Sequence, residues 1–349
     1  MNIELSAEAA EYGRQALQAF GQAGGDELVA AAEAEPGRRE SLVAPVLGEL
    51  GAWQLNPRGD GAELEAAAAL CRSAGYWAVP YPIAERLARP LDLDVDGLVV
   101  VAGQRPSGPV AGLSLRWSAV TVDGRRSLAA ERPSSEPARM SAFVTELDLK
   151  PAGGDGAQDV ALGLVLPCWT LLGMLDRAIQ LTREHVMVRE QFGHPLSTFQ
   201  GVQFQLTDAE VERRGVEALA KYALWSIQDD LPEAVEDALA LRLAAVEAAG
   251  TVFAVAHQLY GALGFCDETT LSWLSRYSEP LRRLPLGRTA TLDELTRRAG
   301  SRGLTGLYSG PAAGVAQGGL AMAPDEASLS SRVPGQAERR VPVAEAEAP

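Results

Sequence analysis

Apolar residues at helical spacing predict two long helices in the C-terminal half of the chain. The first stripe includes Leu172, Leu175 and Ile179, and the second runs through Val202, Leu206, Ala209, Val216, Leu219, Ala223 and Ile227. Steps of three and four residues place such positions on one face of a helix. Between the stripes lie Gly193, which can adopt backbone conformations closed to other residues, and Pro195, which cannot continue a helix. The pattern therefore predicts a helical hairpin with a sharp corner.

A third apolar stripe follows Pro232, a residue that suits the first turn of a helix. It consists of Val235, Leu239, Leu243, Val246, Ala249, Phe253 and Ala256. A stripe of this kind faces a protein core. We therefore expect residues 156–300 to form a C-terminal helical bundle.

The remaining segments differ in character. Residues 1–96 predict an N-terminal helical domain divided by glycine and proline, whereas residues 97–155 predict a small β-domain. Its expected strands are the short β-branched or alternating runs Leu98–Val101, Leu113–Trp117, Ala119–Val122 and Phe143–Leu147. Residues 301–349 contain too few large apolar residues to fold alone, and we expect them to be disordered. The chain is thus predicted to be mainly α with a small β-domain.

Charge and composition exclude several classes of function. The 349 residues carry a net charge of −15, which argues against nucleic acid or an anionic membrane surface as a partner. The three cysteines and three histidines are scattered, so neither a metal site nor a catalytic Cys/His pair is expected. We find no signal peptide and no uninterrupted apolar run of membrane length, and we expect a cytoplasmic protein.

Polar and aromatic side chains gather at the corner of the predicted hairpin. They are Arg189, Gln191, Phe192, Phe199 and Gln200. Arginine and glutamine at a helix end often bond the last free carbonyls. The same groups also suit a phosphate clamp, in which a guanidinium meets pyrophosphate oxygens and an amide adds a directional bond. Spacing alone does not separate these two interpretations.

The corner resembles a signature of the acyl-CoA dehydrogenase family, R-x-Q-F-G-x-P-(I/L)-x-x-F-Q-x-x-Q. The stretch from Arg189 to Gln203 reads REQFGHPLSTFQGVQ and matches at every specified position. A second stretch is similar to the family's Q-x-x-G-G-x-G turn, with Gln258, Gly261 and Gly264 in place and Ala262 where a second glycine is usual. The resemblance implies an N-terminal helical domain, a β middle domain and a C-terminal four-helix bundle. It also implies that an FAD held mainly by a neighbouring subunit is bound through its ADP half by Arg189, Gln191, Phe192, Phe199, Gln200, Gln258, Gly261 and Ala262.

Two departures from the family pattern concern catalysis. The middle domain is about half the usual length and lacks the T-E-P-x-x-G-S-D stretch that holds the flavin ring. The family's catalytic glutamate occupies one of two places, and these correspond to Leu286 and Gly163 in this chain. Neither residue can accept a proton. We therefore predict no catalytic residue in this chain and no metal ligand.

The chain keeps the residues that bind the ADP half of FAD and lacks the catalytic base. In this combination it resembles the short, base-lacking subunit of actinobacterial heterotetrameric acyl-CoA dehydrogenases. The resemblance implies a homologous catalytic partner, a shared FAD and a bulky acyl-CoA substrate, with steroid side chains as one candidate. Two alternatives stay open. The chain is either a self-sufficient flavoenzyme with a displaced base, for which Glu268, Glu279, Asp293 and Glu294 are candidates, or a scaffold that binds no flavin.

Overall fold

The computed structural model describes residues 4–103, 105–132 and 141–302. Nearly all of the predicted disordered tail, residues 301–349, therefore lies outside the described residues. Within them the chain is mainly helical with one small sheet, which confirms the predicted fold class. One hydrophobic core runs from the N-terminal helices through the sheet into the C-terminal helices.

The N-terminal part is a layer of helices. They are α1 (Ala7–Gln22), α2 (Glu27–Ala34), α3 (Arg39–Glu49), α4 (Gly61–Tyr76) and α5 (Ile83–Leu87). Side-chain caps start two of them, because Ser6 accepts a hydrogen bond from the Ala9 backbone N–H and Asp60 accepts one from Glu63. Helix α4 ends at Tyr76, and the turn that contains Pro80 and Pro82 follows it. Helix α5 begins directly after Pro82.

A five-stranded sheet follows in the order β1-β3-β4-β5-β2. Its strands are β1 (Gly97–Val101), β2 (Ser107–Gly108), β3 (Trp117–Thr121), β4 (Arg125–Glu131) and β5 (Thr145–Asp155). The β1–β3 pair is parallel, and the remaining pairs are antiparallel.

One strand prediction was wrong, and strands β2 and β4 were not predicted. Residues 113–116 form no strand, because Leu113 belongs to a turn in which its N–H bonds the Val110 carbonyl. The sequence analysis also missed β4, whose residues RRSLAAE lack β-branched side chains. Pairing with β3 on one side and β5 on the other makes it a strand despite its low propensity.

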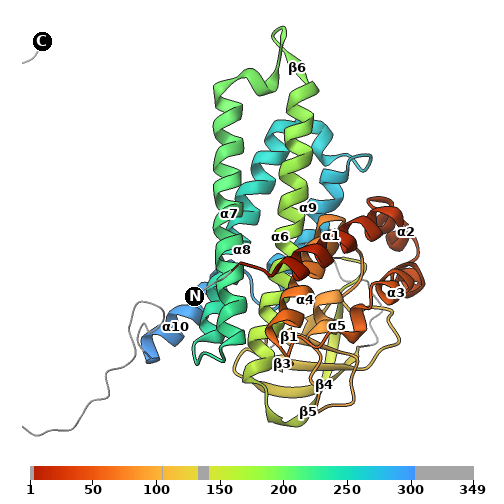
Figure 1. Cartoon of the computed structure of the whole chain (residues 1–349), viewed down its shortest axis with the longest axis vertical. Helices are drawn as coiled ribbons and strands as arrows, with labels where there is room; N and C mark the ends of the chain where they lie inside the picture. The colour runs from red at the N-terminus through yellow and green to blue at the C-terminus, as the bar shows by residue number, and fades with distance from the viewer. Residues whose placement is uncertain (1–3, 104, 133–140, 303–349) are drawn as a thin grey trace, which may run out of the picture. The chain divides into compact units, whose positions relative to one another are not determined.

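The C-terminal helices form a tall bundle (Figure 1). They are α6 (Ala157–Val188), α7 (Gln200–Gln228), α8 (Ala234–Tyr260), α9 (Thr270–Arg283) and α10 (Arg288–Arg302). As predicted, α6 and α7 form a hairpin, and most of the third apolar stripe is buried in α8. Two described helices, Ala157–Val188 and Ala234–Phe265, have the length and composition of membrane spans, and 78% and 50% of their most apolar windows are buried inside the protein.

Helices α4 and α6 cross in direct backbone contact. A Cβ atom at Gly75 would overlap the Thr170 carbonyl oxygen, and one at Gly173 would overlap the Arg72 carbonyl oxygen. Both positions therefore require glycine for close approach. This crossing fixes the N-terminal helices against the lower half of α6, beside the sheet.

Candidate functional site

The predicted cofactor-binding corner is the tip of the hairpin between α6 and α7 (Figure 1). Two short strands, β6 (Glu190–Gln191) and β7 (His194–Pro195), pair across the turn, and a 3₁₀ turn leads into α7. The Arg189 N–H bonds the His185 carbonyl, and the Arg189 carbonyl accepts from the Leu196 N–H. Backbone bonds therefore hold the corner together without help from the side chains of Arg189, Gln191 and Gln200.

Of the polar side chains of the signature, Gln203 donates a hydrogen bond to the Ser197 carbonyl at 2.9 Å, and the other three are uncommitted. Arg189, Gln191 and Gln200 are exposed, and within the described residues their side chains form no hydrogen bond or ion pair. In particular, neither Arg189 nor Gln191 bonds a helix carbonyl. Their donors are free to meet a ligand, as the phosphate-clamp interpretation requires.

The aromatic residues of the corner are held in a defined arrangement. Phe192 has a backbone φ of 54°, in the left-handed region that non-glycine residues rarely adopt, and Gly193 follows with a φ of 80°. The Phe192 ring is 90% exposed and meets Phe199 edge to face, with ring centroids 6.3 Å apart. The turn thus presents a flat apolar surface to the outside.

The second signature segment lies beside the end of α6. The Tyr260 hydroxyl donates a hydrogen bond to the Leu181 carbonyl, and its ring stacks on His185. Burial, with the positive charge of Arg189, lowers the pKa of His185 and favours the neutral ring. The two segments, separated by 54 residues in sequence (204–257), are therefore both connected to the end of α6.

The turn after α8 has room for a ligand. Gly261 ends the helix with a φ of 63°, and nothing lies within 4 Å of where its Cβ would be. Gln258 and Ala262 are exposed, and the Gln258 side chain makes no hydrogen bond within the described part of the chain. Gly264 is different, because a Cβ there would lie 2.9 Å from the Tyr260 Cβ. Gly261 is therefore open to a ligand, whereas Gly264 is needed for packing.

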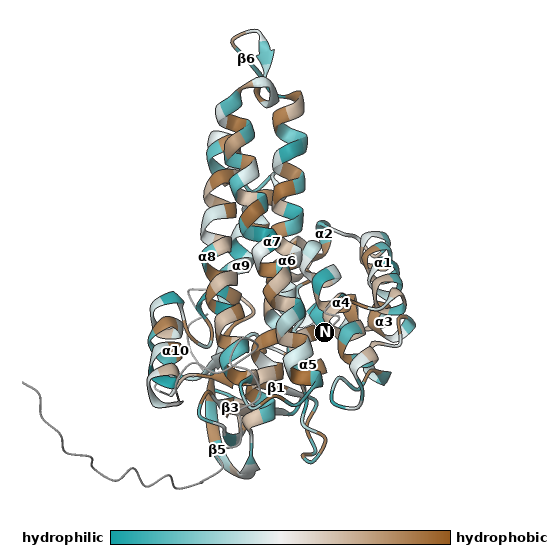
Figure 2. Cartoon of the chain, turned by 60° about the vertical axis from the view of Figure 1, so that its left-hand side comes forward, coloured by the Kyte–Doolittle hydropathy of each residue, from teal (hydrophilic) through white to brown (hydrophobic). Residues whose placement is uncertain are grey.

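Most of the large apolar side chains that the described residues leave exposed gather around this end of the bundle. They are Met187, Val188, Phe192, Phe204, Val211, Leu263 and Phe265. Figure 2 shows apolar residues along the upper part of the hairpin helices. Large exposed apolar areas mark interaction sites.

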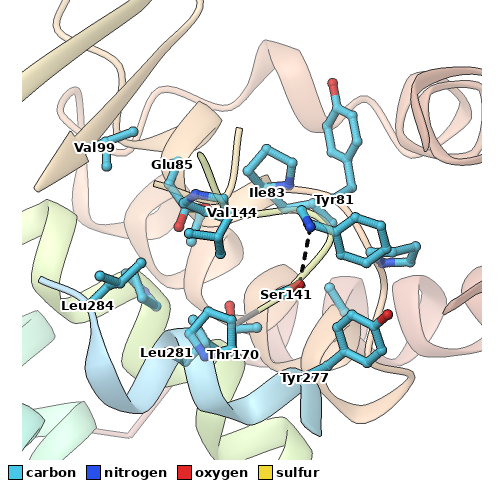
Figure 3. A pocket seen from close by; sticks show the side chains of 18 of the residues that line it. Tyr81, Ile83, Glu85, Val99, Ser141, Val144, Thr170, Tyr277, Leu281 and Leu284 are labelled. Atoms are coloured by element: carbon cyan, nitrogen blue, oxygen red, sulfur yellow. Dashed lines mark hydrogen bonds between the residues drawn. The ribbon is translucent and has the colours of Figure 1, made fainter. Parts of the chain in front are cut away.

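A separate pocket contains Gly163, one of the two positions where the resemblance places the family's base (Figure 3). It encloses about 1010 Å³, partly open to solvent, between α5, β1, α6 and α9, and Gly163 and Pro285 are among its lining residues. A Cβ at Gly163 would lie 2.5 Å from Cγ2 of Val100, so close packing with β1 requires glycine here. Beside Pro285, the Leu286 carbonyl is fixed by two N–H groups of the buried Arg242.

None of the four acids considered as displaced bases lines this pocket. Glu279 is paired with Arg282 and Arg283. Hydrogen bonds from Arg297 and Arg298 lower the pKa of Glu294. Glu268 and Asp293 are exposed.

The pocket does contain one carboxyl, Glu85 of α5, which the sequence analysis missed. Burial raises the pKa of Glu85 to about 7, although its own backbone N–H and the positive charge of Arg39 oppose the shift. A glutamate in a short helix after a proline turn has no signature of its own. Its neighbours Arg39, Val144 and Leu281 come from distant parts of the chain.

Comparison with known proteins identifies the class. Residues 164–287 match the family model described as acyl-CoA dehydrogenase, C-terminal domain. This part of the chain is therefore similar to the C-terminal domain of the acyl-CoA dehydrogenases. Both signature segments, Arg189–Gln203 and Gln258–Gly264, fall inside the matched region.

Individual relatives add detail. Acyl-CoA dehydrogenase FadE28 of Mycobacterium tuberculosis is 35% identical over 92 residues, which are 26% of this chain and 27% of the relative. Acyl-CoA dehydrogenase FadE27 of the same organism is 36% identical over 59 residues, 17% of this chain and 16% of the relative. The chain thus aligns with about a quarter or less of the length of these curated relatives.

Solved structures share the fold over most of the chain. The ChsE4–ChsE5 complex from Mycobacterium tuberculosis aligns with a TM-score of 0.64 at 18% identity, covering 87% of this chain and 100% of that one. A variant of the Tcur3481–Tcur3483 steroid ACAD aligns with a TM-score of 0.68 at 21% identity, covering 84% and 98%. Identities this low show a common fold.

Proposed function

We propose that this chain is the non-catalytic subunit of a heteromeric, FAD-dependent acyl-CoA dehydrogenase. It binds the ADP half of an FAD whose ring lies in a homologous catalytic partner, and the complex desaturates a bulky acyl-CoA. One observation carries the proposal. The side chains of Arg189, Gln191 and Gln200 are uncommitted at the hairpin tip, whereas the two base positions hold a glycine and a leucine.

The residues at the tip fit the diphosphate of such a cofactor. The Arg189 guanidinium supplies charged donors, and Gln191, Gln200 and Gln258 supply amides. Phe192 and Phe199 offer flat apolar surface, and Gly261 and Ala262 form a turn where the backbone can be approached. FAD bound there supplies the hydride acceptor, and the residues of this chain anchor it and hold it in place.

The exposed apolar side chains around the tip support a protein partner on the same surface. Two structural neighbours are described as pairs, ChsE4–ChsE5 and Tcur3481–Tcur3483, and the second is described as a steroid ACAD. We extend both features to this chain as proposals: a related subunit as the partner, and a steroid side-chain thioester as one candidate substrate. We place the complex in the cytoplasm.

A self-sufficient flavoenzyme is the second candidate, because one carboxyl, Glu85, does line the pocket that contains Gly163. A general base must reach the proton that it removes. Under this alternative the isolated chain with added FAD oxidises an acyl-CoA, and Glu85→Gln abolishes the reaction with flavin still bound. Under the principal proposal the isolated chain is inactive.

The decisive experiment measures the visible spectrum and the released FAD of the full-length chain. The chain is purified alone and after co-expression with a candidate catalytic acyl-CoA dehydrogenase subunit from the same genome. A colourless chain that becomes part of a yellow complex supports the shared site. A chain that is yellow alone, with one FAD per protomer, contradicts it. A colourless complex of the two proteins identifies a flavin-free scaffold.

A further inference from the structure

The pocket beneath the bundle is a site separate from the hairpin tip. Its lining residues on α6 end at Met174, 15 positions before Arg189. At a rise of about 1.5 Å per residue, the two sites lie roughly 22 Å apart along the helix. The walls of the pocket are mainly apolar, with Ile83, Val99, Val144, Met174, Leu281 and Leu284 among them.

Few polar groups in this pocket are left for a ligand. The Thr170 hydroxyl donates to the Leu166 carbonyl at 3.4 Å, and the Ser141 hydroxyl accepts from the Phe143 N–H at 3.2 Å. Figure 3 shows Glu85 near Ile83 and Val144, across the open space from Leu281 and Leu284. Glu85 is the one carboxyl among the lining residues, and it has no ion-pair partner within the described part of the chain. It is the group best placed to hold a polar head group.

Two buried guanidiniums restrict the charge of that head group. Arg39 donates to the carbonyls of Pro109 and Ala111 and lies over the Phe143 ring, and Arg242 donates to the carbonyls of Leu281 and Leu286. Nε of Arg39 is buried without a hydrogen-bond partner among the described residues. Both positive charges remain, and neither is paired with a carboxylate in that part of the chain. These two cations repel an ammonium head group. Glu85 repels a carboxylate head group once Glu85 is ionised. A hydroxyl group avoids both repulsions and still has a proton to donate.

We propose that this pocket binds a largely apolar alcohol, aliphatic or fused-ring, whose hydroxyl group donates a hydrogen bond to the Glu85 carboxylate. The site needs neither flavin nor a partner, so it goes beyond the function proposed above. Because burial raises the pKa of Glu85 to about 7, the acceptor is mainly ionised only above neutral pH. The preference for an alcohol is therefore strongest at pH 8 and above.

The test uses the full-length chain at pH 8.5 without flavin. Nile red, a neutral apolar dye, is bound to the pocket and displaced by decan-1-ol or by decyl methyl ether, which has an oxygen but no hydroxyl proton. Hydrogen bonds to charged groups correspond to a preference of about tenfold or more, so the alcohol displaces the dye at about tenfold lower concentration. In Glu85→Leu, which keeps the apolar volume, the alcohol and the ether displace the dye equally well. In Glu85→Gln, whose amide keeps an acceptor oxygen, part of the preference remains.

The matched control is Glu8→Leu, which removes an exposed carboxylate on α1 and leaves the tenfold preference unchanged. Equal displacement by alcohol and ether in the unmodified chain overturns the proposal, as does a preference that persists in Glu85→Leu. Failure of decan-1-ol to displace the dye also overturns it. Because no flavin enters the experiment, its outcome is independent of the shared-cofactor site.

Discussion

The ring of His185 stacks on the ring of Tyr260, with centroids 4.2 Å apart and planes inclined by 15°. His185 lies one helical turn before Arg189, and Tyr260 lies directly before Gly261. The stack therefore joins the two segments that carry the family signature. Together with the hydrogen bond from Tyr260 to the Leu181 carbonyl, it keeps their spacing fixed without a direct contact between them.

Arg189→Ala should lower flavin retention by the assembled complex. The guanidinium has no hydrogen bond or ion pair within the described residues, so its removal leaves the fold of this chain intact. Loss of one charged hydrogen bond to the diphosphate weakens binding by about 1.5–3 kcal/mol, or roughly ten- to more than a hundredfold. The measurement is FAD dissociation from the complex. Arg14→Ala on α1, far from the tip, is the control, and a complex with unchanged flavin content would falsify the role of Arg189.

Phe192→Gly should separate assembly from stability. Glycine relieves the left-handed backbone at this position but adds conformational entropy to the unfolded chain, and each effect is about 1 kcal/mol. The melting temperature of the isolated chain should hardly change. Removal of a ring that is 90% exposed should nevertheless weaken association with the partner, measured as the dissociation constant of the complex. A variant that unfolds more easily yet assembles normally would show that the ring serves the fold.

Gly163→Ala and Gly215→Ala should change stability in opposite directions. The added methyl group at position 163 meets Val100, and overpacking of this kind destabilises by about 1–3 kcal/mol. At position 215, exposed on α7 with nothing within 4 Å, alanine stabilises the helix by about 0.5–1 kcal/mol. Denaturant unfolding measures both changes. Equal effects at the two sites would show that β1 yields to the methyl group.

Acid should destabilise the chain through Glu217. Burial alone would raise the pKa of this carboxyl, but the guanidiniums of Arg72 and Arg213 outweigh it and lower the pKa to about 2. The folded chain therefore holds the ionised form more strongly than the unfolded chain does. This contribution is complete above the ordinary pKa of 4.5 and is lost as the pH falls towards 2. Glu217→Gln should be less stable at neutral pH and should lose less stability on acidification.

Glu85 should have the opposite effect on stability. Its folded pKa of about 7 lies above the ordinary value of 4.5, so the folded chain binds the extra proton between these pH values. Its contribution to stability therefore decreases as the pH rises from 4.5 through 7. Glu85→Gln removes this decrease and should be more stable than the unmodified chain at pH 8, measured by thermal unfolding across the pH range. A pH profile identical to that of the unmodified chain would mean that Glu85 titrates normally.

The fold could be predicted where the pattern is local. Stripes such as Leu239 to Ala256 in α8 repeat over several turns, and a helix with such a stripe has few alternatives. Strand β4 could not be predicted, because its pairing with β3 and β5 overrides a sequence that favours no strand. The hairpin corner lies between these cases, since Gly193 and Pro195 predict a turn but do not predict the left-handed backbone at Phe192.

The candidate site, like the fold, could be predicted only where its residues are close together in the sequence. The Arg189 segment carries its chemistry in consecutive residues, so a single sequence displays it. Glu85 acquires its raised pKa from burial, which outweighs the opposing charge of Arg39. The residues that line the pocket with it, such as Val144, come together only in three dimensions. The Glu85 carboxyl is therefore identified as a candidate ligand group by the pocket that it lines and not by the sequence around it. Whether the signature residues bind FAD stays a prediction.

The crossing of α4 and α6 at Gly75 and Gly173 has a consequence for the pocket. Ala74 and Thr170 line the cavity, and each lies next to or opposite this backbone contact. Helices already in backbone contact cannot approach further, and the packed core around them resists separation. That wall of the cavity is therefore nearly incompressible. We expect the width of a ligand to decide whether it enters the pocket, before its head group contacts any polar residue.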